Sequence, residues 1–237
     1  MSAKTIIVTG ASRGIGLAIA KYLLTSPQSH NVVVIARSVE PLQKLKEQYT
    51  KQVEVLNGDL ADLSIGQKAV DLALKSFGRL DGMVLNHGVL GQVGKIAEAD
   101  PEQWKQGFDV NFISFVAFIK AGLPALRETK GKLVFTSSGA AVSAYRGWGL
   151  YGATKAAMNH LALTLGEEEP DRELREDHAT TLEPQVHSKF TTVHKDGKLL
   201  KPEQPGHVMA KLVLDGPKEL SGKFLSWNDK ALDAFQA

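Results

Sequence analysis

The chain has 237 residues, 43% of them hydrophobic and 23% charged, which suffices for a sizeable core and excludes a disordered, collagen-like or coiled-coil protein. A net charge of +2 is far from the dense basic surface of a duplex-binding domain, so we expect no nucleic-acid partner. The sequence contains no cysteine, which excludes disulfides, thiolate zinc sites and cysteine nucleophiles and fits a reducing compartment.

Two apolar stretches are candidates for membrane insertion, but neither has the length and composition that insertion requires. The run Met1–Thr9 is too short for a secretory signal and ends at Gly10. The stretch Phe112–Leu126 contains Lys120 and Pro124 and is shorter than a bilayer span. We therefore expect a soluble cytoplasmic protein with no membrane partner.

Short β-branched runs alternate with longer amphipathic segments along the first 170 residues. The expected strands are Thr5–Thr9, Asn31–Ala36, Val53–Leu56, Gly82–Leu85 and Lys132–Thr136. The expected helices are Ile15–Leu24, Pro41–Tyr49, Ser64–Phe77, Pro101–Leu126 with a break, and Leu150–Glu168. This alternation predicts an α/β fold: a single Rossmann-type, doubly wound parallel sheet with helices on both faces, in one domain over residues 1–237.

The pattern changes after Pro170. Residues 172–205 are mostly polar, include several prolines and show no convincing strand. Because long loops in compact domains are commonly lids or binding segments, we expect a substrate lid there. A last apolar run, Gly222–Trp227, predicts one final strand.

A glycine-rich loop directly follows the first expected strand. Its sequence is Gly10-Ala11-Ser12-Arg13-Gly14-Ile15-Gly16. Glycines allow a tight turn and let backbone N–H groups approach a pyrophosphate, whose charge a helix N-terminus also favours. The spacing departs from G-x-G-x-x-G, and three glycines alone could be a structural turn. Their place between strand and helix favours dinucleotide binding by Gly10, Ser12, Arg13, Gly14, Ile15 and Gly16.

The second strand ends in Arg37, where an NAD enzyme would place a carboxylate for the ribose 2′-hydroxyl. A guanidinium at this position can pair with a 2′-phosphate, and Arg13 in the glycine loop can reach the same group. Solvated surface arginines are the alternative. Two arginines and no acid before Glu40 favour NADP as the cofactor.

Polar residues also follow the third and fourth expected strands. Asp59 and Leu60 come after the third, and Asn86 and Gly88 after the fourth. The carboxyl ends of strands are where open α/β sheets bind ligands, so all four are candidate cofactor contacts, with Asp59 accepting from the adenine amino group. A helix cap or a turn would explain Asp59 and Gly88 equally well.

Tyr151 and Lys155 are four residues apart at the start of an expected helix, so they lie on one face. An ammonium group within a few Å of a phenol stabilises the phenolate, which suits a general acid or base acting on an alcohol or ketone. Such pairs are common by coincidence. Ser138, at the end of the fifth strand, could present its hydroxyl to the same substrate oxygen.

Together these motifs resemble the short-chain dehydrogenases/reductases, from Lys4 to about Glu169. The resemblance rests on Thr9-Gly10-x-x-x-Gly14-x-Gly16, Asn86-His87-Gly88 in place of the family's usual Asn-Ala-Gly, Asn111, Ser138, Tyr151 and Lys155. Less specific marks, Asn86-His87-Gly88-Val89-Leu90 and Ser226-Trp227-Asn228-Asp229, resemble the sepiapterin reductase and fungal benzil reductase branch.

The resemblance implies a catalytic tetrad. Tyr151 would be the acid/base, Ser138 would polarise the carbonyl, Lys155 would assist Tyr151 and hold the nicotinamide ribose, and Asn111 would anchor a water molecule leading to Lys155. Tyr151 would contact the cofactor as well. It also implies an NADPH-dependent carbonyl reductase acting on a small ketone or diketone, as a homo-dimer or homo-tetramer.

Two other functions remain open at this point. A cofactor-binding regulator or scaffold would keep the fold without turnover, although the complete Ser138, Tyr151 and Lys155 set argues against it. An epimerase or dehydratase would share the Tyr-x-x-x-Lys pair but normally needs a larger substrate domain.

The family carries a sixth strand after the Tyr-Lys helix, and the sequence predicts none here. Losing it would strip hydrogen-bond partners from two neighbouring strands, at a cost comparable to the whole stability of a domain, ~5–15 kcal/mol. This raises the hypothesis that Asp171 and Arg172 are not covalent neighbours and that a strand and a turn between them are missing.

Three further features carry less weight. His178, His187 and His194 do not have the spacing of a helical ligand pair, so we expect no metal site. The apolar stripe around Phe112 and Phe115 predicts core or subunit packing. Trp148 could wall a pocket for an aromatic or diketone substrate, or simply pack.

Overall fold

The computed structural model describes residues 2–169, 179–183 and 201–236. Its strands form one parallel sheet in the order β3-β2-β1-β4-β5-β6-β7, which confirms the predicted Rossmann-type architecture. The strands are β1 (Thr5–Thr9), β2 (Asn31–Ala36), β3 (Val53–Asn57), β4 (Gly82–Leu85), β5 (Lys132–Thr136), β6 (Ala179–Glu183) and β7 (Phe224–Ser226).

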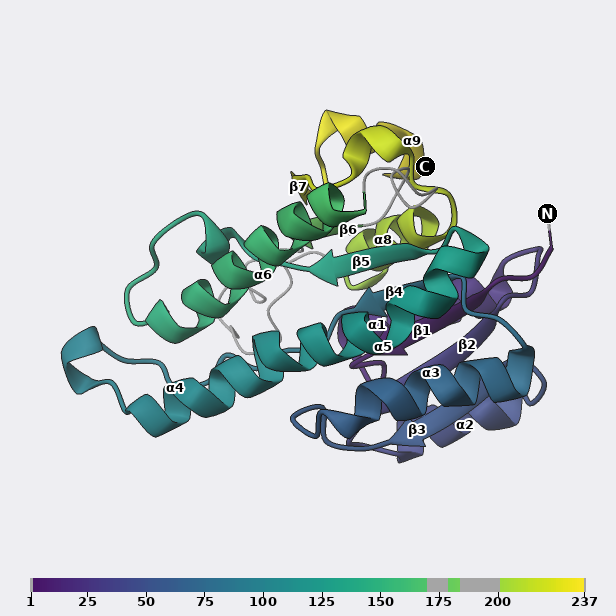
Figure 1. The fold of residues 1–237 in the computed structure, drawn as a ribbon, viewed down its shortest axis with the longest axis horizontal. Coiled ribbons are helices and arrows are strands. Elements are labelled where there is room, and N and C mark those ends of the chain that lie inside the picture. Colours follow the sequence, from purple (N-terminus) through teal and green to yellow (C-terminus); the bar gives the residue numbers. More distant parts are fainter. Residues whose placement is uncertain (1, 170–178, 184–200, 237) are drawn as a thin grey trace.

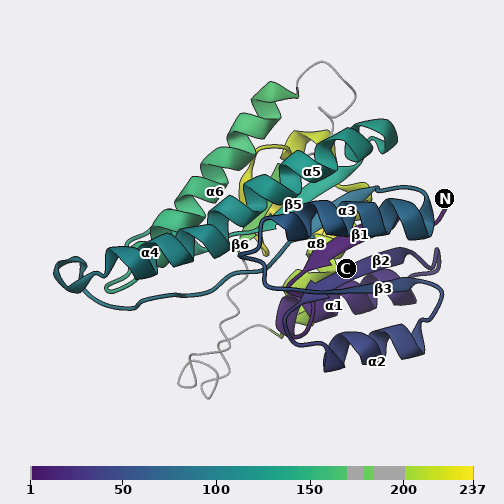
Figure 2. The same ribbon diagram turned by 60° about the horizontal axis from the view of Figure 1, so that its bottom comes forward.

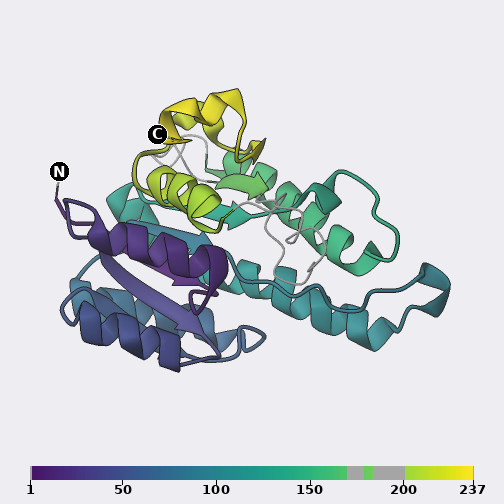
Figure 3. The same cartoon turned by 180° about the vertical axis from the view of Figure 1, so that it is seen from behind.

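Helices cover both faces of this sheet (Figures 1 and 2). They are α1 (Gly14–Thr25), α2 (Glu40–Gln48), α3 (Ser64–Phe77), α4 (Pro101–Phe108), α5 (Ser114–Thr129), α6 (Gly149–Glu168), α8 (Glu203–Asp215) and α9 (Asp233–Gln236). The group α3, α5 and α6 lies on one face and the group α1, α2 and α8 on the other. Seen from behind, purple α1 and yellow-green α8 lie side by side (Figure 3).

The alternating side chains of the strands supply a separate core to each face. In β1, Ile6 and Val8 belong to the core beneath α1 and α8, where they join Met209. Ile7, between them, belongs to the core beneath α3, α5 and α6, where it joins Phe118. Successive residues of a strand point to opposite faces, so the continuous apolar runs of the sequence reflect burial on both sides.

The expected break in the long fourth helical segment is a π-helical turn, Asp109–Ile113, between α4 and α5. By length and composition alone, the stretch Pro101–Thr129 contains a segment that is long and apolar enough to cross a membrane. Its apolar residues Phe115, Phe118 and Ile119 are buried in the core against the sheet. The absence of a membrane partner stays a prediction.

The expectation of no strand between residues 172 and 205 is wrong. Ala179–Glu183 forms β6, which pairs in parallel with β5 on one side and β7 on the other. A central strand receives ladder hydrogen bonds from two neighbours, so it needs only a weak pattern of its own. The hypothesis of a missing strand thereby loses its premise; the junction of Asp171 with Arg172, like most of the expected lid, lies outside the described residues.

Two elements near the C-terminus complete the fold. The helix α8, which the sequence analysis did not predict, starts after Pro202 and buries Val208, Met209 and Val213 against the sheet and α1. The expected strand at residues 222–227 is present as the shorter β7.

Candidate active site

A cleft of about 700 Å³ opens at the carboxyl ends of the central strands. In Figure 1 the arrowhead of β5 points toward the end of the molecule where α4 and the start of α6 project. The cleft brings together nearly all of the predicted site residues: Gly10, Ser12, Arg13, Gly14, Ile15, Arg37, Asp59, Leu60, Asn86, Gly88, Ser138, Tyr151 and Lys155. Of the predicted set, Gly16 and Asn111 are buried and do not line the cleft.

The glycine loop has the backbone that its sequence requires. Gly10 and Gly14 have φ of 67° and 56°, in the left-handed region that favours glycine. A Cβ added to Gly16 would lie 2.7 Å from Asn86 Nδ2 and closer still to the Gly10 carbonyl oxygen. Gly16 therefore serves close packing of α1 against the loop, and Gly10 and Gly14 serve the turn that opens toward the cleft.

Asn86 lines the cleft, but its side chain is used to join strands. Its Nδ2 donates to the Thr9 carbonyl (3.2 Å), and its Oδ1 accepts from Thr136 Oγ1 (3.0 Å). Its backbone N–H donates to Thr9 Oγ1 at 2.9 Å. Asn86 thus links the ends of β1, β4 and β5, which fixes the floor of the site.

Two arginines line the cleft beside the glycine loop and the end of β2. Arg13 is the residue before α1, Arg37 follows β2, and both are exposed. Neither forms an ion pair with another of the described residues. The Asn57 side chain donates to the Ala36 and Arg37 carbonyls (3.2 and 2.9 Å), which holds the backbone of Arg37 in place. The guanidinium groups are therefore available to an anionic ligand.

Asp59 forms a turn and also lines the cleft, and its predicted contact with adenine stays a prediction. Its Oδ1 accepts from the Ala61 N–H at 3.1 Å, which stabilises the turn. Leu60 beside it is nearly buried and forms part of the cleft wall.

Lys155 is 2% exposed and lies at the base of the cleft. Its Nζ donates to the Thr136 carbonyl at 2.6 Å and lies 5.7 Å from the centroid of the Tyr151 ring. Burial lowers the pKa of Lys155 to about 8. The predicted pair is thus assembled on the first turns of α6, with the ammonium group beneath the phenol ring.

Ser138 lines the same cleft as Tyr151, and Trp148 packs against the Tyr151 ring. Ser138 follows β5, and its Oγ accepts from the Ala140 N–H at 3.2 Å, which leaves its hydroxyl hydrogen available to another acceptor. The Trp148 ring packs edge-on against Tyr151, with centroids 5.7 Å apart. Ser138, Tyr151 and Lys155 all line the one cleft.

Asn111 is fully buried in the π-helical turn. Its Oδ1 accepts from the Val89 N–H and its Nδ2 donates to the Val89 carbonyl, both at 2.8 Å, and Nδ2 also lies 3.1 Å from Thr154 Oγ1. A Cβ on Gly88 would lie 3.3 Å from Asn111 Oδ1. These contacts hold Asn111 between Val89 and Thr154, the residue before Lys155 on α6. Its predicted contact with a water molecule stays a prediction.

Sequence reasoning did not assign roles to several residues that build the site. Thr9, Asn57, Thr136 and Thr154 position the predicted residues through the hydrogen bonds above. His87 lines the cleft and is buried. Of these, Thr9, His87 and Thr154 stand inside motifs that the sequence displays, but the partners that give them their roles are distant in the chain.

The residues of the cleft fit a dinucleotide. Its volume is in the range of small-molecule sites, ~300–1,000 Å³. The glycine loop presents backbone without side chains, and two exposed arginines lie at one end, as a phosphorylated ligand requires. Among residues 2–169, 179–183 and 201–236 no group of three or more His, Asp and Glu side chains could hold a metal ion. His178, His187 and His194 lie outside these ranges.

Comparison with known proteins agrees with this geometry. Residues 4–176 match the family model for short chain dehydrogenase. The chain is 37% identical over 260 residues to the benzil reductase of Saccharomyces cerevisiae that forms (S)-benzoin, with 98% of this chain and 99% of that protein covered.

Two solved structures extend the comparison. A Saccharomyces cerevisiae protein described as cytoplasmic and of unknown function is 36% identical, with a TM-score of 0.85 over 99% of this chain and 100% of that one. A short-chain dehydrogenase of Shigella flexneri complexed with NADP is 25% identical, with a TM-score of 0.83 over 97% of this chain and 98% of that one. The chain therefore belongs to the short-chain dehydrogenase family, in the branch that includes fungal benzil reductase.

Proposed function

We propose that this oxidoreductase is an NADPH-dependent carbonyl reductase that converts a ketone or diketone to an alcohol. The observation that carries the proposal is the convergence of Ser138, Tyr151 and buried Lys155 on one cleft that also contains the glycine loop and two arginines. The bound nicotinamide cofactor would supply the hydride.

The residues of this chain would supply the proton and the alignment. Ser138 donates its hydroxyl hydrogen to the carbonyl oxygen of the substrate and so orients and polarises it. Tyr151 donates its phenolic proton to the same oxygen as negative charge develops there. The positive charge of Lys155, near the ring at 5.7 Å from its centroid, stabilises the phenolate that remains.

The cofactor preference rests on Arg13 and Arg37. Both are exposed in the cleft, and no carboxylate follows β2 before Glu40. A 2′-phosphate would pair with these guanidinium groups, whereas NADH has no group that needs them. The NADP complex of a family member with a TM-score of 0.83 supports the same cofactor.

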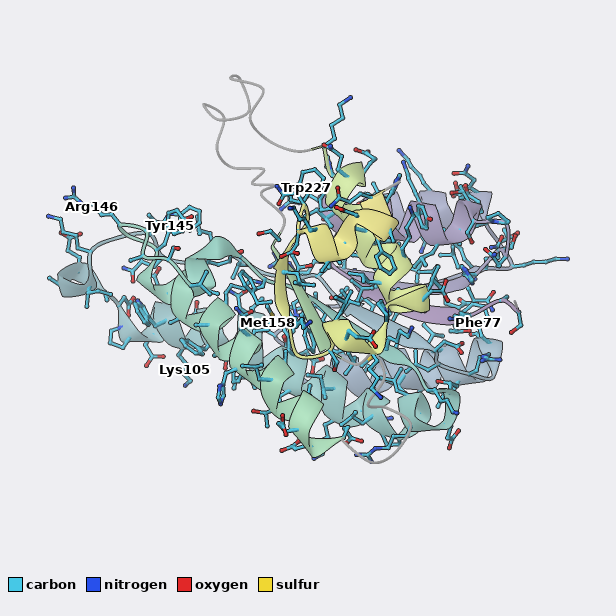
Figure 4. All side chains as sticks on the ribbon, turned by 90° about the horizontal axis from the view of Figure 1, so that it is seen from above. Phe77, Lys105, Tyr145, Arg146, Met158 and Trp227 are labelled. Atoms are coloured by element: carbon cyan, nitrogen blue, oxygen red, sulfur yellow. The ribbon has the colours of Figure 1, made fainter. Side chains whose placement is uncertain are left out.

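We propose that the two loops before α4 and α6, called the lip here, favour a bulky apolar substrate. Val93, Ile96, Val142 and Tyr145 are each more than half exposed. Their loops are joined by the Gly94 N–H donating to the Gly147 carbonyl at 3.1 Å. Figure 4 places Tyr145 at the end of the molecule opposite Phe77.

Aromatic rings connect this lip to the catalytic phenol. The Tyr145 and Trp148 rings are 5.5 Å apart, and the Trp148 and Tyr151 rings 5.7 Å. Exposed apolar side chains beside a cleft are typical of a binding surface, and aromatic walls favour aryl groups. The name of the benzil reductase relative points to the same class, aryl diketones.

Assembly and location complete the proposal. Members of this family act on small molecules and commonly assemble, and we propose a homo-dimer or homo-tetramer, which light scattering of the purified chain would test. A cytoplasmic location is proposed by analogy with the yeast protein described as cytoplasmic.

A substrate screen that follows NADPH absorbance tests the function. We expect the protein to consume NADPH with benzil faster than with a small aliphatic diketone. Trp148→Ala should reduce the preference for benzil over the aliphatic diketone by roughly tenfold. The variant loses an aromatic contact of ~1 kcal/mol and some apolar area, and ~1.4 kcal/mol corresponds to a factor of ten. NADPH binding without consumption across the panel would instead identify a regulator.

A further inference from the structure

His87 follows β4 at a position where the family motif usually has alanine. Its side chain is 5% exposed and lines the cleft beside the buried Phe115 ring, with ring centroids 4.5 Å apart. A buried imidazole needs hydrogen-bond partners for both nitrogens, so the residues around His87 must supply two hydrogen-bonding groups.

Both nitrogens of His87 have a hydroxyl partner. Nδ1 lies 2.7 Å from Thr9 Oγ1, and Nε2 lies 2.8 Å from Ser114 Oγ. The Ser114 hydroxyl donates its single hydrogen to the Val110 carbonyl at 2.7 Å, so it can only accept from His87. Nε2 therefore carries the ring proton. Nδ1 accepts the hydroxyl hydrogen of Thr9, because it lies 2.7 Å from Oγ1 whereas the competing acceptor, the Val84 carbonyl, lies at 3.4 Å; the Thr9 oxygen also accepts the N–H of Asn86.

The setting keeps this imidazole neutral. Burial, and then the nearby charge of Lys155, lower the pKa of His87 to about 3. With both nitrogens engaged and a low proton affinity, His87 is poorly suited to transfer protons at neutral pH.

The partners of His87 connect it to the catalytic helix. Val110 precedes Asn111 in the π-helical turn, and Ser114 directly follows the turn at the start of α5. Such turns are rare and are frequent at functional sites. Asn111 in turn contacts Thr154 on α6 at 3.1 Å. The Thr154 hydroxyl donates to the carbonyl of Tyr151 at 2.8 Å.

We propose that His87 is a positioning residue: its neutral imidazole ties the π-helical turn to β1, and it thereby holds Asn111 and, through Thr154, the first turn of α6 that carries Tyr151. A chain with alanine at this position could not make the link from Thr9 to Ser114. The effect on turnover rests on the proposed function, whereas the tautomer and the geometry of Asn111 do not.

Hydrogen exchange of one backbone amide gives a readout without turnover. The Val89 N–H donates to Asn111 Oδ1, so its exchange rate reports whether Asn111 is in place. We expect His87→Ala and Ser114→Ala to speed this exchange at least tenfold, and Ser114→Thr, which keeps the hydroxyl, to leave it within roughly twofold of wild type. The Val32 amide, bonded to the Gln52 carbonyl at 2.7 Å, is the remote control.

Histidine-labelled protein gives the second readout. In a nitrogen-15 correlation spectrum, assigned by its loss in His87→Ala, the His87 ring should show a protonated Nε2 and an unprotonated Nδ1 from about pH 5 to 8. An imidazolium or the opposite tautomer would overturn the proposal, as would unchanged Val89 exchange in both alanine variants.

Turnover supplies the third readout. We expect each single alanine variant to lower kcat by roughly tenfold with NADPH affinity within twofold, and the double variant to lose no more than either single one, because both break the same link. Additive losses would contradict a shared link. If the wild-type protein shows no turnover, the proposed function fails, while exchange and tautomer still decide the role of His87.

Discussion

At the scale of single residues, Tyr151 makes the most direct prediction. Tyr151→Phe keeps the ring, and with it the contact to Trp148, and removes only the hydroxyl. We expect carbonyl reduction to fall by roughly 10²–10⁴-fold, the usual contribution of a positioned acid, with NADPH affinity nearly unchanged. Steady-state kinetics and a binding titration would measure this. Tyr49→Phe, just after α2 and outside the cleft, is the matched control and should behave like wild type.

Lys155 predicts a pH dependence of stability. Burial lowers its pKa from 10.5 to about 8 in the folded protein. Between these two pH values the unfolded chain holds more protons than the folded one, so the stability of the cofactor-free protein rises with pH. Relative to Lys155→Met, the wild-type free energy of unfolding should gain up to about 3 kcal/mol over this window.

Urea unfolding at several pH values would test the Lys155 prediction. The exposed lysine of α1, Lys21, provides a control, because Lys21→Met should leave the pH profile unchanged. Parallel stability profiles for wild type and Lys155→Met would refute the assignment of a lowered pKa to Lys155.

For Arg37 we predict a change in the ratio of kcat/KM with NADPH to kcat/KM with NADH. Arg37→Asp replaces attraction to a 2′-phosphate by repulsion and places a carboxylate where an NAD enzyme keeps it. We expect the preference for NADPH over NADH to fall by at least ~10–100-fold, with NADH use unchanged or improved, since a charge-assisted pair contributes ~1.5–3 kcal/mol. Arg13 should retain part of the preference, so full reversal needs both arginines changed.

The measurement for Arg37 is kcat/KM with each cofactor. Lys21→Asp makes the same change of charge on α1 and should leave the ratio intact. Equal losses with NADPH and NADH would mean that Arg37 supports the fold instead of reading the phosphate.

At the scale of elements, the contact between the glycine loop and α1 depends on Gly16. Its missing side chain lets the helix approach Asn86 Nδ2, which a Cβ would meet at 2.7 Å. Gly16→Ala should therefore lower the free energy of unfolding by roughly 1–3 kcal/mol through overpacking and weaken NADPH binding. Gly166→Ala in α6 is the control: the nearest atom would be 3.9 Å away, so helix propensity should stabilise that variant by up to ~1 kcal/mol.

Thermal and chemical unfolding of both glycine variants would decide this. A Gly16→Ala protein as stable as wild type would show that the loop relaxes freely around the added methyl group. The same comparison separates the cost of crowding from the general gain of alanine in a helix.

At the scale of the whole molecule, β6 lies between β5 and β7 and so connects the last strand to the rest of the sheet. Thr181 stands opposite Phe135 of β5 and Phe224 of β7. Thr181→Pro removes a ladder N–H from a central strand and leaves a buried carbonyl without its donor, so we expect the free energy of unfolding to fall by about 1–3 kcal/mol. Thr181→Ala keeps the N–H and should cost clearly less. Circular dichroism on denaturation would measure both, and equal stabilities would argue against a central β6.

The local motifs were readable from sequence because their chemistry depends on neighbours in the chain. The strand and helix from Thr5 to Thr25, the glycine spacing and the Tyr151–Lys155 pair all follow from short-range periodicity, and the structure reproduces them. The family follows from the order of these motifs, and the family model confirms it.

The sequence by itself determined the alternating α/β plan, the phosphate loop and the identity of the catalytic candidates. The tertiary structure decided the rest, because it depends on partners far apart in the chain. The strand β6 has a weak pattern of its own and is stabilised by β5 and β7. The helix α8 is different: its apolar residues Val208, Met209, Leu212 and Val213 have helical spacing in the sequence, and the sequence analysis missed it. As with β6, the role of His87 emerges only when β1 and α5 bring Thr9 and Ser114 to its two nitrogens. Long-range contacts of this kind leave no periodic signal in a single sequence.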